Sequence, residues 1–204
     1  MWNKDGNNYI TKLSTLISGV QKDFVLELSI PANNKELQDD EKNIIVASAE
    51  ADITTLDGKH LTKKAELTIT LLNEGEDCKD DEEDDREVMK NFFRLKGALI
   101  MTEARKFADQ GSYDDAKKKL QSFKEELENS FLKNEEFIKN LIKDINQAIE
   151  NVNPIVYDQV GKHEMMENAR AQMYQKSNLK SANCYQNSVQ YDMMTSVRAM
   201  KSKK

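Results

Sequence analysis

Apolar and polar residues alternate along the first third of the chain, which is typical of β-strands with one buried face. The alternation predicts strands over 9–17, 24–30, 43–55 and 65–72. Asp57-Gly58 separates the last two and favours a tight turn, so we expect a hairpin there. One face of this hairpin should carry Ile45, Ala47, Ala49, Ala51, Ile53, Ala65, Leu67, Ile69 and Leu71. Roughly four antiparallel strands form a thin sheet or sandwich, whose apolar face must pack on helices or on further strands.

From residue 88 onward the apolar spacing changes to the period of a helix. It predicts helices from 88 to Gly111, from Ser112 (a possible cap) to 127, over 137–152, and over about 156–175. Two adjacent apolar stripes on the first helix predict a central position. The fourth helix should pack loosely, because it contains a glycine and several methionines. Its inward residues should be Tyr157, Val160, Met165 or Met166, Ala169 and Met173.

The 204 residues carry a net charge of −6, and this charge is unevenly distributed. Residues 74–87 hold ten acids and two bases, a local charge of −8, whereas the chain from Lys162 onward has a local charge of +5. We therefore expect an α+β chain in four parts. These are an antiparallel β domain over 1–73, an acidic linker over 74–87, a bundle of about four helices over 88–176, and a polar basic tail over 177–204.

Candidate chemistry is sparse. His60 and His163 lack further ligands at metal-binding spacing, and neither Cys78 nor Cys184 has a histidine nearby in the sequence. The acidic run does not match a calcium-binding loop, and no glycine-rich phosphate loop is present. We expect no enzymatic activity, cofactor or metal. The isolated cysteines, and the lack of a leader or a long apolar run, favour an intracellular location, in the cytoplasm or alternatively in a cilium.

The tail is the candidate partner-binding region. Its bases and tyrosines form a loose patch without an RNA-binding signature, so we expect no specific nucleic acid, and tubulin tails or anionic membranes are equally allowed. The chain has no membrane span by sequence, and we expect protein partners within a larger assembly. The candidate contact residues are Tyr174, Tyr185, Tyr191, Val197 and Met200.

Several short segments resemble one family. Residues 17–31 (with Gly19 and Pro31), 47–57, 91–94 and 173–200 are similar to the region that follows the A domain in von Willebrand factor A proteins of protists, plants and fungi. These proteins also carry Hint, RING or U-box modules. The resemblance implies a β-sandwich and a helical bundle that flank an A domain and mediate assembly. The A domain's Asp-x-Ser-x-Ser motif is missing here, so an A domain could only lie elsewhere in the full-length protein.

The resemblance extends to 104–120, which also looks like one tetratricopeptide hairpin, although no second copy is present and a generic helical hairpin fits better. No ligase or self-processing residue carries over from the family. We therefore expect a non-catalytic interaction or scaffold region of a larger protein. The alternatives are an accessory region of a ubiquitin ligase, whose catalytic module lies outside this chain, and a structural subunit of a large assembly such as a ciliary one.

Overall fold

The computed structural model describes residues 3–6, 8–13, 22–29, 42–72 and 82–175. The chain forms two compact units, which are described separately below. One comprises Leu26–Glu82, and the other combines Met1–Val25 with Glu83–Lys204. The first contains a long β-hairpin and the second contains the helices and a short hairpin. The fold is therefore of the expected α+β class.

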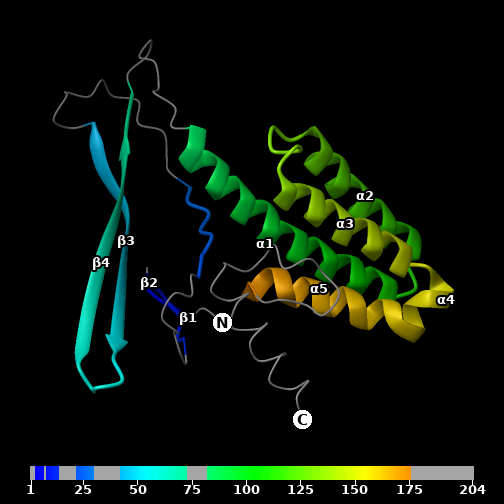
Figure 1. Cartoon of the computed structure of the whole chain (residues 1–204), viewed down its shortest axis with the longest axis horizontal. Helices are drawn as coiled ribbons and strands as arrows, with labels where there is room; N and C mark the ends of the chain where they lie inside the picture. Colours follow the sequence, from blue (N-terminus) through cyan, green and yellow to red (C-terminus); the bar gives the residue numbers. More distant parts are fainter. Residues whose placement is uncertain (1–2, 7, 14–21, 30–41, 73–81, 176–204) are drawn as a thin grey trace, which may run out of the picture. The chain divides into compact units, whose positions relative to one another are not determined.

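Strands β3 (Asn43–Thr54) and β4 (His60–Thr70) form the predicted antiparallel hairpin (Figure 1). Gly58 turns the chain with a φ of +78°, which is readily accessible to glycine. The Thr55 N–H donates to the Lys59 carbonyl at 2.9 Å and closes the turn. β4 begins at His60, five residues before the predicted start at Ala65, because the cross-strand pairing continues to the turn.

A β-bulge in β3 changes which residues share a face. Ile44 lies opposite Ile69 and Ile45 opposite Thr68, but Ala47 is the next paired residue and lies opposite Leu67. Val46 is therefore the extra residue of the bulge. Past it the alternation shifts by one, so that Ile44 joins the apolar face of the alanines while Ile45 moves to the polar face. The prediction was wrong for these two isoleucines, because the sequence pattern alone does not reveal that Val46 is an extra residue in the strand.

The predicted four-stranded sheet was also wrong. The described residues form two separate two-stranded sheets, the second being β1 (Asn3–Asp5) with β2 (Asn8–Ile10). Residues 22–29 form no strand, although Phe24, Leu26 and Leu28 alternate as predicted and are 45–61% exposed. Alternation of apolar and polar residues defines one apolar face, but a β-strand also needs a neighbouring strand with which its backbone can form hydrogen bonds. Of the predicted strand over 9–17, residues 9–10 belong to β2, residues 11–13 form no strand, and residues 14–17 lie outside the described residues.

The helical unit is an antiparallel bundle, as predicted (Figure 1). It consists of α1 (Glu82–Asp109), α2 (Tyr113–Asn129), α3 (Glu136–Asn151), the short α4 (Pro154–Val156), the π-helical turn η1 (Tyr157–Gly161) and α5 (Lys162–Tyr174). α1 begins at Glu82, so its first residues come from the segment expected to be an acidic linker. Gly111 has a φ of +80° and ends α1, whereas Ser112 occupies the N-cap position of α2 without a capping side-chain hydrogen bond.

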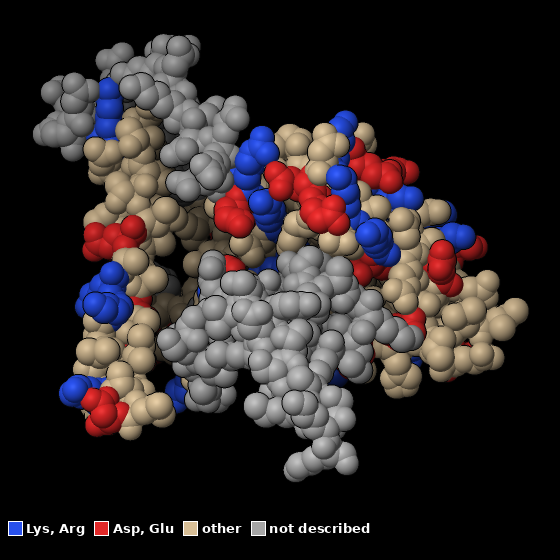
Figure 2. All heavy atoms as spheres, in the orientation of Figure 1, with Lys and Arg blue, Asp and Glu red and all other residues tan. Residues whose placement is uncertain are grey.

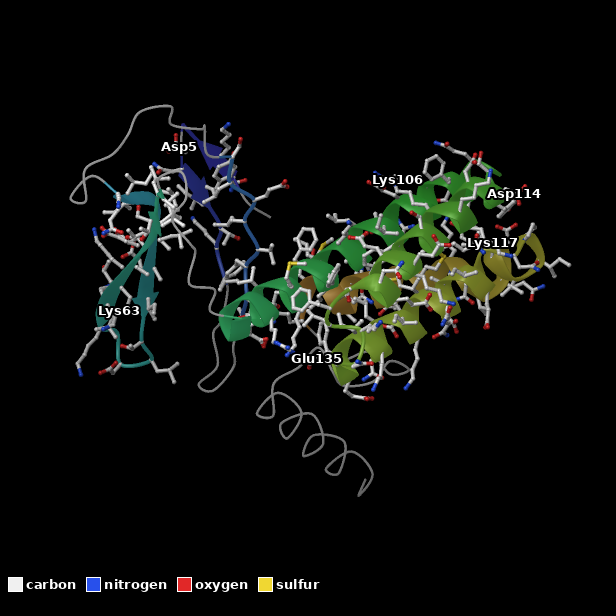
Figure 3. All side chains as sticks on the ribbon, turned by 90° about the horizontal axis from the view of Figure 1, so that it is seen from above. Asp5, Lys63, Lys106, Asp114, Lys117 and Glu135 are labelled. Atoms are coloured by element: carbon white, nitrogen blue, oxygen red, sulfur yellow. The ribbon has the colours of Figure 1, made fainter. Side chains whose placement is uncertain are left out.

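The buried apolar residues of α2 and α3 follow the helical spacing that predicted these two helices. The buried faces of both helices pack into one core with α1, η1 and α5; its largest fully buried members include Met101, Leu120, Leu127, Ile138, Leu141, Ile145, Tyr157 and Met165. Charged pairs connect the outer surfaces, for example Lys119 with Glu103 at 2.5 Å. Opposite charges alternate over the visible surface of the helices (Figure 2). Glu135, at the start of α3, accepts from Arg86 of α1 at 3.2 Å (Figure 3).

Only one of the two apolar stripes of α1 is buried. Phe93 and Ala104 of one stripe lie in the core, whereas in the other stripe Val88 is 62% and Leu99 47% exposed. One face of α1 is therefore exposed, although α1 packs against three other helices. Its neighbours α2, α3 and α5 approach α1 on the side of Gly97, where an added Cβ would lie 3.2–3.3 Å from Leu141 and Phe123.

A buried polar cluster joins α1, α3 and α5. The Arg94 guanidinium donates to the backbone carbonyl of Gln172, and the Gln172 side-chain amide donates to the Asp144 carboxylate at 3.1 Å. All three side chains are at most 6% exposed. Buried polar groups are costly without partners, so these contacts restrict how the three helices can slide or rotate.

The π turn η1 connects α4 to α5 and packs against the end of α3. Asn153 caps α4 by accepting from the Ile155 N–H at 3.0 Å. Gly161 then lies so close to α3 that an added Cβ would be 2.4 Å from the Asn151 carbonyl oxygen. Because the π turn shifts the helical phase, Gly161 is buried and Val160 is 49% exposed. The predicted inward position of Val160 was therefore wrong; Met173, also predicted inward, is 36% exposed.

Replacing Gly161 by Ala should destabilise the helical unit. The new methyl group would collide with backbone rather than with a flexible side chain, and overpacking of this kind costs about 1–3 kcal/mol. That cost opposes a gain in helix propensity of about 1 kcal/mol. Urea unfolding followed by circular dichroism measures the net change. Gln159→Ala in the same turn, at an exposed position, is the matched control and should not lower the midpoint.

Candidate partner-binding groove

A cavity of about 200 Å³ lies between α1 and α5. These helices run side by side in the bundle (Figure 1). We call this cavity the methionine groove, because four of the nine described residues that line it are methionines. The lining residues are Met101, Thr102, Arg105, Met165, Met166, Ala169, Arg170, Met173 and Tyr174.

Helical spacing places these side chains together. Met101 and Arg105 are four residues apart on α1, and Met165, Ala169 and Met173 follow the same spacing on α5, so each set lies on one helix face. Met101 and Met165 are at most 1% exposed and anchor the wall to the core. Met173 is 36% exposed, so the groove combines a fixed base with an accessible rim.

Arg105 is the least satisfied polar residue of the groove. Its Nε atom is buried and has no hydrogen-bond acceptor among the described residues. A buried donor without an acceptor costs free energy, which an incoming acceptor would recover. Arg170 on the opposite wall adds a second positive charge; its nearest acid, Glu167, lies 3.7 Å away in an exposed pair. No acidic residue is among the described residues that line the groove.

The backbone of Arg105 is held by a neighbouring polar cluster. The Tyr157 hydroxyl donates to the Arg105 carbonyl at 3.0 Å and to the Asp109 carboxylate at 2.8 Å, and Lys162 pairs with Asp109 at 2.7 Å. Burial, followed by the hydrogen bond to Asp109, raises the pKa of Tyr157. The hydrogen bond from Lys162 is the largest cause of a lowered pKa for Asp109. The tyrosine therefore stays protonated and the aspartate ionised at neutral pH.

Tyr174, one of the predicted contact residues, lies at the rim of the groove and is 54% exposed. The extended segment that contains Lys22 and Asp23 is hydrogen-bonded to the C-terminal end of α5. Lys22 donates to the Tyr174 carbonyl at 2.7 Å, and the Asp23 N–H donates to the Gln175 side chain at 3.0 Å. The other predicted contact residues, Tyr185, Tyr191, Val197 and Met200, lie outside the described residues.

Sequence reasoning missed Met101, Arg105 and Arg170. The methionines of α5 were noted as a sign of loose packing, and they could have indicated a groove. Arg105 gave no sequence signal, because its lack of an acceptor depends on which helix packs beside α1. The exposed stripe of α1, including Val88 and Leu99, adds accessible apolar surface that leads along the helix to Thr102.

The remaining sequence candidates form no site in the described part of the chain. His60 lies 3.1 Å from the Thr54 hydroxyl in the hairpin, and His163 is exposed on α5. Across the described ranges no group of three His, Cys, Asp or Glu residues could hold a metal ion. Cys78 and Cys184 lie outside them. None of the helices in these ranges has the length and apolarity needed to cross a membrane.

Comparisons with known proteins identify no relative. No family model, no curated protein and no solved structure matches the chain.

Replacing Asp109 by Asn should lower stability at neutral pH by up to about 1 kcal/mol, the range measured for exposed charge pairs. The pKa of Asp109 is lowered in the folded state, so its contribution exists above the unfolded pKa near 3.8 and is lost as the pH falls. The difference from the parent protein should therefore shrink between pH 5 and pH 2.5. Urea midpoints measured across this range test the prediction, with Glu125→Gln on the exposed face of α2 as the control. A difference that does not change with pH would contradict it.

Proposed function

We propose that this chain is a non-catalytic protein-binding region, and that the methionine groove receives side chains of a partner. The observation that carries the proposal is the buried Nε of Arg105, which lacks an acceptor among the described residues at the wall of the methionine-rich groove. A partner that supplies the acceptor would complete a charge-assisted hydrogen bond.

The size of the groove favours a protein partner over a small molecule. Sites for drug-sized ligands usually measure about 300–1,000 Å³, whereas this cavity measures about 200 Å³. Such a volume suits one or two anchoring side chains, which is how binding energy is concentrated at protein interfaces. The exposed stripe of α1 adjoins the groove and offers further contact surface over about 21 Å of helix from Val88 to Thr102.

The lining favours an apolar segment that carries carboxylates. Methionine side chains are flexible and polarisable, so they adapt to differently shaped apolar groups. Arg105 and Arg170 provide positive charge on both walls, and the described lining residues include no acid. An acidic amphipathic peptide meets both requirements. Tyr174 would extend the same interface, and Tyr185, Tyr191, Val197 and Met200 remain proposed partner contacts.

The family resemblance leads to a wider proposal, that the chain assembles beside a von Willebrand A domain inside the cell. The coding sequence on either side discriminates among the possibilities. An Asp-x-Ser-x-Ser motif upstream would support the A-domain protein, and a Cys/His-rich zinc module would support a ubiquitin ligase. If the flanking sequence contains neither motif, the third alternative, a structural subunit of a large assembly, is favoured.

A matched pair of synthetic peptides tests the groove directly. Two 20-residue amphipathic helices share the same leucines, and one carries glutamates where the other carries lysines. We expect the acidic peptide to bind and to shift the methyl NMR signals of Met165, Met166 and Met173. Equal binding of the basic peptide, or unchanged methionine signals, would contradict the proposal.

Replacing Arg105 by Gln should weaken binding of the acidic peptide by at least about 30-fold, since loss of one member of a desolvated charge pair costs about 2–5 kcal/mol. Lys106→Gln is the control, because Lys106 is the next residue of α1, is exposed and does not line the groove (Figure 3). Titration calorimetry measures both affinities. If the two variants lose affinity equally, only general charge attraction is involved.

A further inference from the structure

The outer edge of β4 has no strand beside it in the described part of the chain. β4 pairs only with β3, and no residue of either strand is buried. A two-stranded hairpin is marginally stable in water, and an open edge readily pairs with another strand.

Two hydrogen bonds at the ends of β4 show which backbone groups face outward. The Lys59 carbonyl accepts from Thr55, and the Leu71 N–H donates to the Lys42 carbonyl at 2.8 Å, so both residues direct these groups toward β3. Backbone groups alternate in direction along a strand. The even-numbered residues between them, including Lys64 and Glu66, therefore present their N–H and C=O groups at the outer edge.

We propose that β4 pairs antiparallel with β4 of a second copy of the chain, with Ala65 opposite Ala65 across the two-fold axis. In this register Lys64 of each copy lies opposite Glu66 of the other. The even-numbered residues then face each other, as their outward backbone groups require. The remaining pairs are Lys63 with Leu67, Thr62 with Thr68, Leu61 with Ile69 and His60 with Thr70. The sequence of β4 is thus complementary to itself in both charge and apolar pattern.

Neighbouring registers are unfavourable. Centring the pair on residue 64 places Lys64 opposite Lys64, and centring it on residue 66 places Glu66 opposite Glu66; like charges directly opposite are destabilising. The other edge of the hairpin is less suitable, because the bulge at Val46 interrupts β3. Like-charge repulsion therefore favours the register centred on Ala65 over its two neighbours. The regular backbone of β4 favours its edge over that of the bulged β3.

The pairing also aligns the two apolar faces. Odd-numbered residues meet odd-numbered residues, so the row of Ala49 and Ala65 continues into the same two residues of the second copy. The result is a four-stranded sheet with a continuous apolar face. Lys63 is the one charged residue on that face of the hairpin (Figure 3) and would lie opposite Leu67 of the second copy. Its aliphatic stem can cover that leucine while the ammonium group reaches water.

Charge reversal tests the register. Within one hairpin Glu66 lies opposite the uncharged Ser48, so Glu66→Lys leaves the internal pairs intact but places lysine opposite Lys64 of the second copy. In the reverse variant, Glu50→Lys with Lys64→Glu, the internal 2.7 Å pair is kept with its signs exchanged. Each variant alone should dimerise about tenfold more weakly than the parent chain, because two symmetric pairs become repulsive. An equimolar mixture should form heterodimers with the parent affinity.

Sedimentation equilibrium on the full chain measures these affinities. A parent chain that remains monomeric at the highest soluble concentration would overturn the proposal, as would a Glu66→Lys variant that associates as strongly as the parent. Circular dichroism of each variant shows whether it is folded. These outcomes concern the hairpin and are independent of peptide binding in the methionine groove.

A disulfide tests the central contact. In a chain with Cys78 and Cys184 replaced by Ser, Ala65→Cys should form a covalent dimer rapidly under mild oxidation, since directly opposite Cβ atoms lie about 4.5–5.5 Å apart. Ala49→Cys is the control, because Ala49 belongs to the same face but to β3, so that the Ala49 residues of the two copies would lie three strands apart. Equal rates of cross-linking for the two variants would contradict the proposed register.

Discussion

The arrangement of the helical unit depends on one buried residue, Gln172. Its backbone carbonyl accepts from Arg94 of α1, its side chain donates to Asp144 of α3, and its tip lies where a Cβ on Gly97 would be 2.8 Å away. Apolar packing alone would tolerate small slides between the helices. Buried polar groups tolerate far less, because each must keep its partner. The walls of the methionine groove follow from this, since α1 and α5 are fixed relative to each other by that cluster.

Much of the helical unit could be predicted from spacing alone. α2 and α3 each bury one face of strict helical period, so Leu120, Leu127, Ile138 and Ile145 could be assigned to the core. α1 is apolar on two faces, and only the packing of its neighbours decides which one is buried. The strands were less predictable, because residues 24–28 alternate as clearly as β3 but have no strand partner in the described chain.

The candidate site was far less predictable. It joins residues 101–105 to residues 165–174, and its distinguishing property is a missing acceptor rather than a residue type. No sequence motif encodes such an absence. The β4 edge is different, because its self-complementary order of residues can be read from the sequence once the strand and its register are known. The two units thus offer surfaces of different kinds: a groove suited to side chains and an edge suited to a backbone.

The π turn η1 has a consequence for the groove. One additional residue in a helical turn advances every later side chain by about 100° around the axis. The five residues of η1, Tyr157–Gly161, form a π-helical turn beside the end of α3. This turn sets the rotation of α5, so that Met165, Ala169 and Met173 line the groove with α1. A chain shortened by one residue here could keep every groove residue and still direct these side chains away from Arg105. The chemistry of the groove is therefore encoded in the length of a segment that does not line it.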